Sequence, residues 1–249
     1  SINTKYREYG AVIYADESVI IFTSRRVGST GGKIDPIINE HFEDLYISYK
    51  QEDGSWSPAE NLGDNVNSDD HDAVSAVSAD GQKVLIFLGR KNNGGDLYEC
   101  TLEGDVWSKP VSLGKNVNTK EYHESSACYS PDGNTIYFVS NKPGGIGDHD
   151  IYMTKIDEKG KWGPATNLGT TINTQFDEEA VFMHPNGKTL YFSSKGHTSM
   201  GGYDIFKSVY DEATQSWSTP ENLGYPVNTA DDDAFFVLSA DGKHGYLTS

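Results

Sequence analysis

The sequence predicts an all-β protein, a β-propeller made of four-stranded antiparallel blades. Three observations predict it: a Trp-containing phrase that recurs every 51 to 55 residues, four short apolar runs in each repeat, and glycine-containing turns between the runs. Such turns join the strands of hairpins, and four short strands repeated about every 50 residues are typical of a propeller. No window keeps an apolar period of 3.6 residues over three turns, so we expect almost no helix.

Each repeat is marked by one of the four tryptophans, which we expect to pack between blades. A proline and then a Leu-Gly pair follow each of them, and an asparagine stands eleven residues after each. The tryptophans are Trp56, Trp107, Trp162 and Trp217, and the asparagines are Asn67, Asn118, Asn173 and Asn228. A turn such as Ser130-Pro131-Asp132-Gly133 comes next, and then a third run that opens on Asp-[Leu/Ile]-[Tyr/Phe]. The aspartates of these third runs are Asp44, Asp96, Asp150 and Asp204.

The repeat divides residues 1–249 into blades of one propeller domain. Their approximate bounds are residues 4–65, 66–116, 117–171, 172–226 and, for a partial last blade, 227–249. Ser249 aligns with Ser194 and Ser1 with Pro226, so the last repeat lacks the 31 residues equivalent to 195–225. We therefore expect five blades, the last one incomplete in this chain, with a six-bladed ring as the alternative. The missing half blade is expected to reflect absent chain, disorder or completion by a partner.

The charge excludes several classes of function. The 37 acidic and 20 basic side chains give a net charge of −17 and a pI near 4.6, whereas a nucleic-acid-binding protein needs a basic surface. The same charge disfavours adsorption to anionic lipid, and no run of 18 apolar residues could span a membrane. No leader opens the sequence, so an export signal is expected to have been removed or to lie outside it.

The repeat resembles the WD-like propeller repeat of TolB-type proteins. The residues that carry the resemblance are Ser130-Pro131-Asp132-Gly133, Ile136-Tyr137-Phe138-Val139-Ser140, Pro143-Gly144-Gly145 and Asp150-Ile151-Tyr152. The Trp-Ser-x-Pro-x-Asn-Leu-Gly phrase is similar to a variety found in OmpA-family envelope proteins of Bacteroidetes, among them a peptidoglycan-binding component of the type IX secretion system. Two turns depart from the pattern, at Asn186 and at Asp16-Glu17.

That resemblance implies a localisation and partners. It implies a periplasmic, outer-membrane-associated scaffold that binds other envelope or secretion-system proteins. It implies contact with peptidoglycan only through a neighbouring domain. It gives no reason to expect a cofactor or direct insertion into a membrane. A fold hosts many functions, so the motifs identify the architecture far more specifically than the activity.

One acid recurs at the start of the first run of every repeat. These acids are Glu8, Asp72, Glu124, Glu178 and Asp233, and they are expected to ring one mouth of the central channel. They could bind a cation or a basic peptide, or take part in hydrolysis. We favour a structural role in which each accepts backbone N–H bonds from the neighbouring blade, because catalysis by carboxylates needs two different environments and these positions repeat.

Other reactive residues give little support for catalysis or a metal site. Acidic clusters such as Asp69-Asp70-His71-Asp72 do not follow a calcium-loop pattern, and His71 with His123 would leave zinc short of ligands. Cys100 and Cys128 replace small or apolar residues, so we expect two buried, unpaired thiols. No Gly-x-Ser-x-Gly, His-Glu-x-x-His or Walker motif occurs.

The first repeat contains the main irregularity. About ten extra residues lie within residues 31–42 and include Ile34, Ile37, Ile38 and Phe42, with Arg25 and Arg26 at their base. An apolar insertion in a loop is expected either to dock a partner or to fold back over the blade edge or the channel mouth.

These patterns lead us to expect a non-catalytic interaction module whose candidate contacts are these six residues. The alternatives are a five-bladed glycoside hydrolase with Glu124 and Glu178 in the channel, or a glycan-binding lectin.

Overall fold

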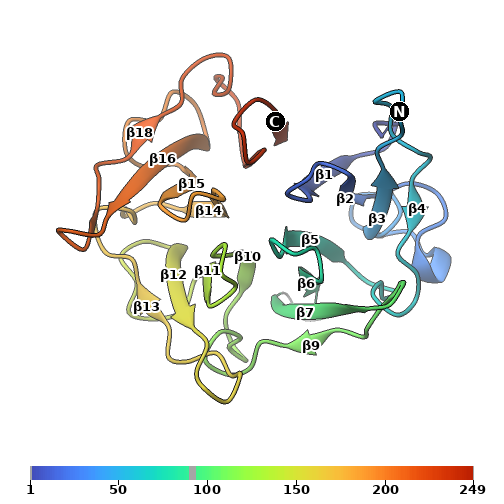
Figure 1. Cartoon of the computed structure of the whole chain (residues 1–249), viewed down its shortest axis with the longest axis horizontal. Helices are drawn as coiled ribbons and strands as arrows, with labels where there is room; N and C mark the ends of the chain where they lie inside the picture. Colours follow the sequence, from blue (N-terminus) through green and yellow to red (C-terminus); the bar gives the residue numbers. More distant parts are fainter. Residues whose placement is uncertain (1, 90–93, 249) are drawn as a thin grey trace.

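Short antiparallel sheets arranged around a central axis make up the fold. The computed structural model describes residues 2–89 and 94–248, so Ser1 and Ser249 of the end alignment lie outside it. Four sheets are complete blades, and β19 and β20 form a fifth sheet of only two strands. Figure 1 shows the blades around the centre, with the C-terminal strands between the last complete blade and the first. The propeller is confirmed, but the complete blades number four, not five or six.

The strands follow the repeat in order. Blade 1 contains β1 (Glu8–Ile13), β2 (Val19–Ser24), β3 (Asp44–Tyr49) and β4 (Glu60–Asn61), with a 3-10 turn, η1 (Thr30–Gly32), between β2 and β3. Blade 2 contains β5 (Asp72–Val77), β6 (Lys83–Gly89), β7 (Gly95–Glu103), β8 (Val106–Trp107) and β9 (Val111–Ser112). Blade 3 contains β10 (Glu124–Tyr129), β11 (Thr135–Ser140), β12 (Asp150–Lys155) and β13 (Thr166–Asn167). Blade 4 contains β14 (Glu178–Met183), β15 (Thr189–Ser194), β16 (Asp204–Asp211), β17 (Ser216–Trp217) and β18 (Glu221–Asn222). The last sheet contains β19 (Phe235–Leu238) and β20 (Gly245–Thr248).

The first strand of each sheet faces the axis, and neighbouring first strands touch. β1 contacts β5, β5 contacts β10, and β10 contacts β14. β19 contacts β14 on one side and β1 on the other, so the two-stranded sheet connects the last complete blade to the first. The inner strands of all five sheets therefore surround one channel.

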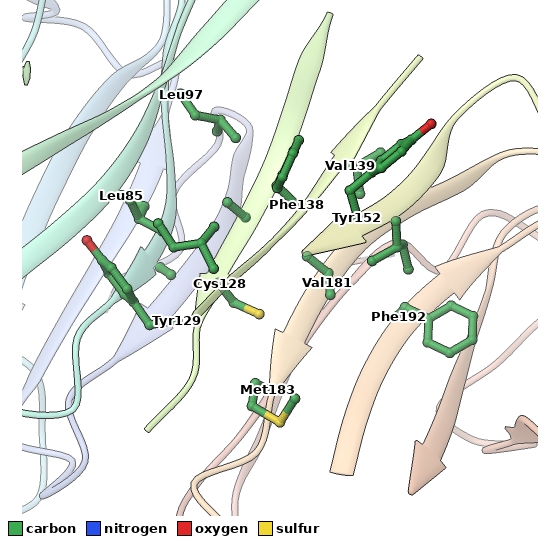
Figure 2. Packing of buried hydrophobic residues seen from close by; sticks show 14 of the residues in the cluster. Leu85, Leu97, Cys128, Tyr129, Phe138, Val139, Tyr152, Val181, Met183 and Phe192 are labelled. Carbon is green, nitrogen blue, oxygen red and sulfur yellow. The ribbon is translucent and has the colours of Figure 1, made fainter. Parts of the chain in front are cut away.

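Apolar side chains fill the spaces between blades. The second strand of a blade is covered on both faces, and every residue of β2 is buried for this reason. Figure 2 shows the largest cluster, in which Leu85 and Leu97 of blade 2 meet Phe138 of blade 3, with Val181 and Phe192 of blade 4 beyond it. Trp107 and Trp162 are buried in such clusters, as the sequence predicted. The packing between blades is thus the repeated core of the protein.

Each repeated asparagine joins one blade to the next. The Asn67 side chain accepts a hydrogen bond from the Leu45 N–H at 2.8 Å and donates one to the Leu45 carbonyl at 3.1 Å. The other three members of the set bond Leu97, Ile151 and Ile205 in the same way. A side-chain amide has a donor and an acceptor, so one residue can satisfy both peptide groups of a strand residue. We call this arrangement the Asn clasp.

No helix within residues 2–89 and 94–248 is both long and apolar enough to cross a membrane.

Candidate functional site

The repeated acids lie beneath the loops of one face of the disc. Four of them are 0–1% exposed. Glu124 accepts bonds from the Thr119 N–H at 3.0 Å, the Thr119 hydroxyl at 2.9 Å and the Ser140 hydroxyl at 2.9 Å. Glu178 has the same three kinds of partner in Thr174 and Ser194. The N–H donors belong to the segment arriving from the preceding blade, so these carboxylates tie that segment to the first and second strands.

Burial sets the ionisation of these acids. It raises the pKa of Glu178 to about 7 against the opposing effect of hydrogen bonds from Thr174 and Ser194. It likewise raises the pKa of Asp72 to about 7. Glu8 is half-buried and paired with Arg26 at 3.1 Å, and its pKa is lowered because bonds from Thr4 and Ser24, with the arginine, outweigh desolvation. Glu124 and Glu178 therefore do not form a solvent-facing pair in the channel.

The insertion at residues 31–42 forms a small hairpin over the start of blade 2. Ile34 and His41 form its β-bridge, and Lys33 pairs with Asp69 on the neighbouring connection. The Phe42 ring lies 4.7 Å from the His71 ring, edge to face. Its apolar residues are thus divided between two environments: Phe42 packs inward, whereas Ile34, Ile37 and Ile38 stay exposed. The expected folding back is seen at Phe42, and the three isoleucines remain as candidates for contact with a partner.

A buried ionic network holds the base of this hairpin. Arg25 pairs with Glu43, and its Nη1 lies 3.6 Å from an oxygen of Asp35. Glu43 also bonds His71 and accepts a hydrogen bond from the Tyr9 hydroxyl at 2.7 Å. Asp35 in turn accepts the Ile37 N–H at 2.8 Å, which fixes the turn at the tip. The network links the hairpin to the first strands of blades 1 and 2.

The two arginines have internal roles. Arg25 is 8% exposed and is occupied by the network described above. Arg26 pairs with Glu8, and its guanidinium carbon lies 5.0 Å from the centre of the Phe22 ring and 4.8 Å from that of Tyr46. Stacking of this kind stabilises a guanidinium that is partly removed from water. The exposed part of the candidate contact set is therefore Ile34, Ile37 and Ile38.

A second polar cluster lies on the same face, between blades 3 and 4. His149 lies 3.1 Å from Asp177, and Lys195 pairs with the same carboxylate at 2.9 Å. Burial raises the pKa of Asp177, but the bonds from Lys195 and His149 outweigh it, and the net shift is downward. In the repeat, His149 and Asp177 occupy the positions of Glu43 and His71, with acid and imidazole exchanged. Both pairs connect adjacent blades.

Glu179 breaks the repeat at a position that the sequence analysis missed. The residue after each repeated acid is Tyr9, Ala73, Ser125, Glu179 or Ala234. Glu179 accepts a hydrogen bond from the Ser125 hydroxyl across the β10–β14 boundary at 2.6 Å. Burial raises its pKa, and that effect exceeds the opposing one of the Ser125 bond. The signal that could have revealed it is this single acid in a column of otherwise uncharged residues.

The opposite mouth of the channel is apolar. A pocket of about 100 Å³ opens there among the ends of all five inner strands, and its lining includes Val12, Tyr129, Phe182, Met183 and Leu238. The repeated acids are absent from this lining. The two mouths therefore differ in chemistry, and the polar groups gather on the face that carries the hairpin.

One group of side chains could approach a metal ion. Ligand atoms of Glu17, Asp241 and His244 lie within 4.8 Å of one another at the tips of two turns. Lys243 pairs with Asp241 at 2.7 Å and Lys50 with Glu17 at 3.4 Å, so ammonium groups already neutralise these carboxylates. The two cysteines are free and buried, as predicted from the sequence.

The fold and the ring of inner strands define a β-propeller, and several solved structures share this fold. Structures with this fold include TolB from Acinetobacter baumannii (TM-score 0.58, 15% identity) and a TolB-like protein from Agrobacterium tumefaciens (0.51, 16%). A periplasmic gluconolactonase from Pseudomonas aeruginosa is also similar (0.52, 12%). The alignments cover 98%, 98% and 95% of this chain, and 54%, 90% and 77% of those proteins, respectively.

The chain thus spans about half the length of the A. baumannii TolB. At these identities the likeness concerns the fold alone. No protein-family profile matches the sequence, and no curated protein matches it.

Proposed function

We propose that this propeller is a non-catalytic scaffold in the bacterial periplasm that docks a protein partner through the hairpin at residues 31–42. The partner is a member of an outer-membrane or peptidoglycan-associated assembly, with type IX secretion as the specific candidate. The TolB-type fold and the Bacteroidetes-like Trp phrase support this setting. The net charge of −17 favours a basic partner surface and association rates that fall as salt rises.

The observation that carries the proposal is the contrast between the base and the tip of the hairpin. Ile37 is 89% exposed at a turn whose backbone is fixed by the buried Asp35, and Asp35 is held beside Arg25. An apolar side chain presented on a rigid support loses little conformational entropy when it enters a partner's pocket. Ile34 and Ile38 extend the same apolar tip.

The test is capture of envelope proteins by the purified propeller, followed by measurement of the dissociation constant for each captured protein. Replacing Ile37 and Ile38 by serine is expected to weaken binding at least about tenfold, because two anchors of roughly 1 kcal/mol or more are lost. Val111 is 65% exposed on the outer strand β9, so Val111→Ser is the matched control and is expected to bind normally. Unchanged binding by the double variant, or by a variant lacking residues 33–42, would refute the docking role.

A binding or hydrolytic site in the channel is the second candidate, and Glu179 is the residue that favours it. It is a channel-strand acid whose pKa is raised by burial, and a single side-chain hydrogen bond, from Ser125, reaches its carboxylate, whereas Glu124 and Glu178 each accept three. A general acid in a glycosidase needs such a raised pKa. A glycan and lactone panel measured with the native protein and with Glu179→Gln separates the candidates. If the native protein binds or converts a compound and Glu179→Gln does not, a site in the channel replaces the scaffold as the proposed function.

A further inference from the structure

The outer edge of β20 differs from every equivalent edge in the molecule. In the complete blades the second strand pairs on both sides: β2 pairs with β1 and β3, and β15 pairs with β14 and β16. Within residues 2–89 and 94–248, β20 pairs only with β19. An unpaired strand edge is a template for another strand, and folded proteins generally cover such edges. The edge of β20 is therefore a position where a strand can be added.

A groove lined by both apolar and polar side chains, Glu8 among the polar ones, lies beside this edge. It has a volume of about 480 Å³, and its lining includes Ile2, Ile20, Phe22, Trp56 and Tyr246. Four of these correspond in the repeat to Val66, Val84, Ile86 and Trp107, which line the boundary between blades 1 and 2. At that boundary Leu45 and Ile47 of the third strand β3 fill the space. The groove is thus the same inter-blade space without third-strand side chains in it.

The asparagines of the Asn clasp have a fifth counterpart in the repeat at this place. Asn3 corresponds in the repeat to Asn67, Asn118, Asn173 and Asn228, and it lines the groove. Each of those four binds the N–H and the carbonyl of a Leu or Ile that follows the aspartate of a third strand. The backbone around Asn3 therefore already carries the residue type that grips a third strand elsewhere in the ring.

We propose that the β20 edge and this groove bind an extended segment of the repeat's own third-strand type, Asp-[Leu/Ile]-[Tyr/Phe]. The segment pairs with β20. Its Leu or Ile enters the groove against Ile2 and Trp56, and Asn3 holds that residue by both peptide groups. Four filled copies in the same molecule show this geometry, and the occupied site makes the two-stranded sheet into a fifth full blade. The proposal is independent of the hairpin and its partner.

The test uses a synthetic 31-residue peptide that copies residues 195–225 of blade 4 with Trp217→Phe, so that it carries no tryptophan of its own, added to the protein. We expect saturable binding by calorimetry, a rise of about 5 °C or more in the unfolding midpoint at saturation, and a change in Trp56 emission. The fluorescence change is expected to vanish in Trp56→Phe while the binding remains. A peptide that carries Ile205→Asp is expected to bind at least about tenfold more weakly, because its carboxylate would lie against Ile2 and Trp56 in a groove that already contains Glu8.

Two protein variants form a matched pair. Asn3→Ala is expected to weaken peptide binding about tenfold, because two hydrogen bonds to the incoming strand are lost. Asn118→Ala removes the same clasp from a filled boundary, so it is expected to lower the unfolding midpoint without changing the affinity for the peptide.

Three results with the peptide would each overturn the proposal: no binding by the peptide, equal binding of the Ile205→Asp peptide, or equal binding of the peptide to native protein and Asn3→Ala. Self-association that the peptide cannot displace would assign the edge to a second copy of the chain, and would also overturn it.

Discussion

Asn173 holds both peptide groups of Ile151, accepting its N–H at 2.8 Å and donating to its carbonyl at 3.0 Å. Asn173 is 1% exposed, and Ile151 is fully buried in the cluster between blades 3 and 4. The side chain thus replaces a missing strand neighbour at a place that water does not reach. A buried peptide group left without a partner costs about 1–3 kcal/mol, so this contact has a measurable value.

Asn173→Ala is therefore expected to lower the free energy of unfolding by about 2–4 kcal/mol, measured by urea titration. Asn134→Ala is the control, because Asn134 lies in an exposed turn where its amide bonds only Asp132. That variant is expected to change stability by less than about 0.5 kcal/mol. Similar losses for both variants would mean that the clasp is not a significant source of stability.

The buried Glu178 predicts a pH dependence of stability. Its pKa is raised to about 7 in the folded state from 4.5, so the folded protein holds the proton over a range in which the unfolded chain has released it. That contribution is fully present below the unfolded pKa and is lost as the pH rises through 7. From this residue alone, the free energy of unfolding is expected to fall by on the order of 2 kcal/mol between pH 5 and pH 8.

The free energy of unfolding of Glu178→Gln is expected to fall less over that interval than that of the native protein, measured by denaturant titration at each pH. At pH 5 this variant is expected to be about as stable as the native protein, because the amide resembles the protonated carboxyl: its oxygen can accept the Thr174 N–H and its NH2 can face the Thr174 and Ser194 hydroxyls. Asn134→Ala leaves this carboxyl and its donors intact and is expected to keep the native decline. If the free energy of unfolding of Glu178→Gln falls as steeply with pH as that of the native protein, Glu178 does not titrate in this range.

The two thiols are expected to be inert in the folded protein. Burial raises the pKa of Cys100 and of Cys128 to about 12, so almost no thiolate is present at pH 8. Ellman's reagent is expected to react with fewer than about 0.1 thiols per native chain within minutes, and with both thiols in concentrated urea. Rapid reaction of the native protein would indicate that an inter-blade core opens readily, because both cysteines lie in those cores.

Phe42 is expected to hold the hairpin in place. Phe42→Ala removes the edge-to-face contact with His71 and should destabilise the closed hairpin by about 1–2 kcal/mol. Trypsin cleavage after the exposed Lys33 is then expected to become about tenfold faster, because the open form is more populated. Ile37→Ala is the control and should leave the rate unchanged, since Ile37 contributes little to holding the hairpin closed. Equal cleavage rates in all three proteins would place the anchoring elsewhere, with Arg25 and Asp35 as the remaining contacts.

The sequence predicted most of the strands because turn residues and short apolar runs determine strands and turns locally, between residues close along the chain. The Asp132-Gly133 turn requires a positive φ, and Gly133 has a φ of 70°. The apolar runs beside such turns became the second strands, and the tryptophans fell between blades. The same repetition made the acids visible and predicted that they ring one mouth of the channel, where backbone N–H groups donate to them. Their actual position depends on the segment around Thr119 and its equivalents, which folds over them.

The repeat pattern could not predict the contacts of residues that depart from it. Arg25 and Arg26 are as polar in sequence as any surface arginine. They are removed from the surface because Glu43 and Asp35 meet the first and Phe22 and Tyr46 stack on the second. Glu179 gained its raised pKa from burial that only the meeting of β10 and β14 creates.

The amino-acid sequence alone determined that the repeating unit is a four-stranded blade, how far apart the units lie along the chain, and where the Trp and Asn residues recur. It could do so because turns and alternating apolar runs act between residues close along the chain. Only the tertiary structure decided how the ring is arranged around its axis, which charged groups face water and where a groove lies open. Those properties arise between residues such as Asn3, Trp56 and Tyr246, which come together only when the ends of the chain meet at the ring.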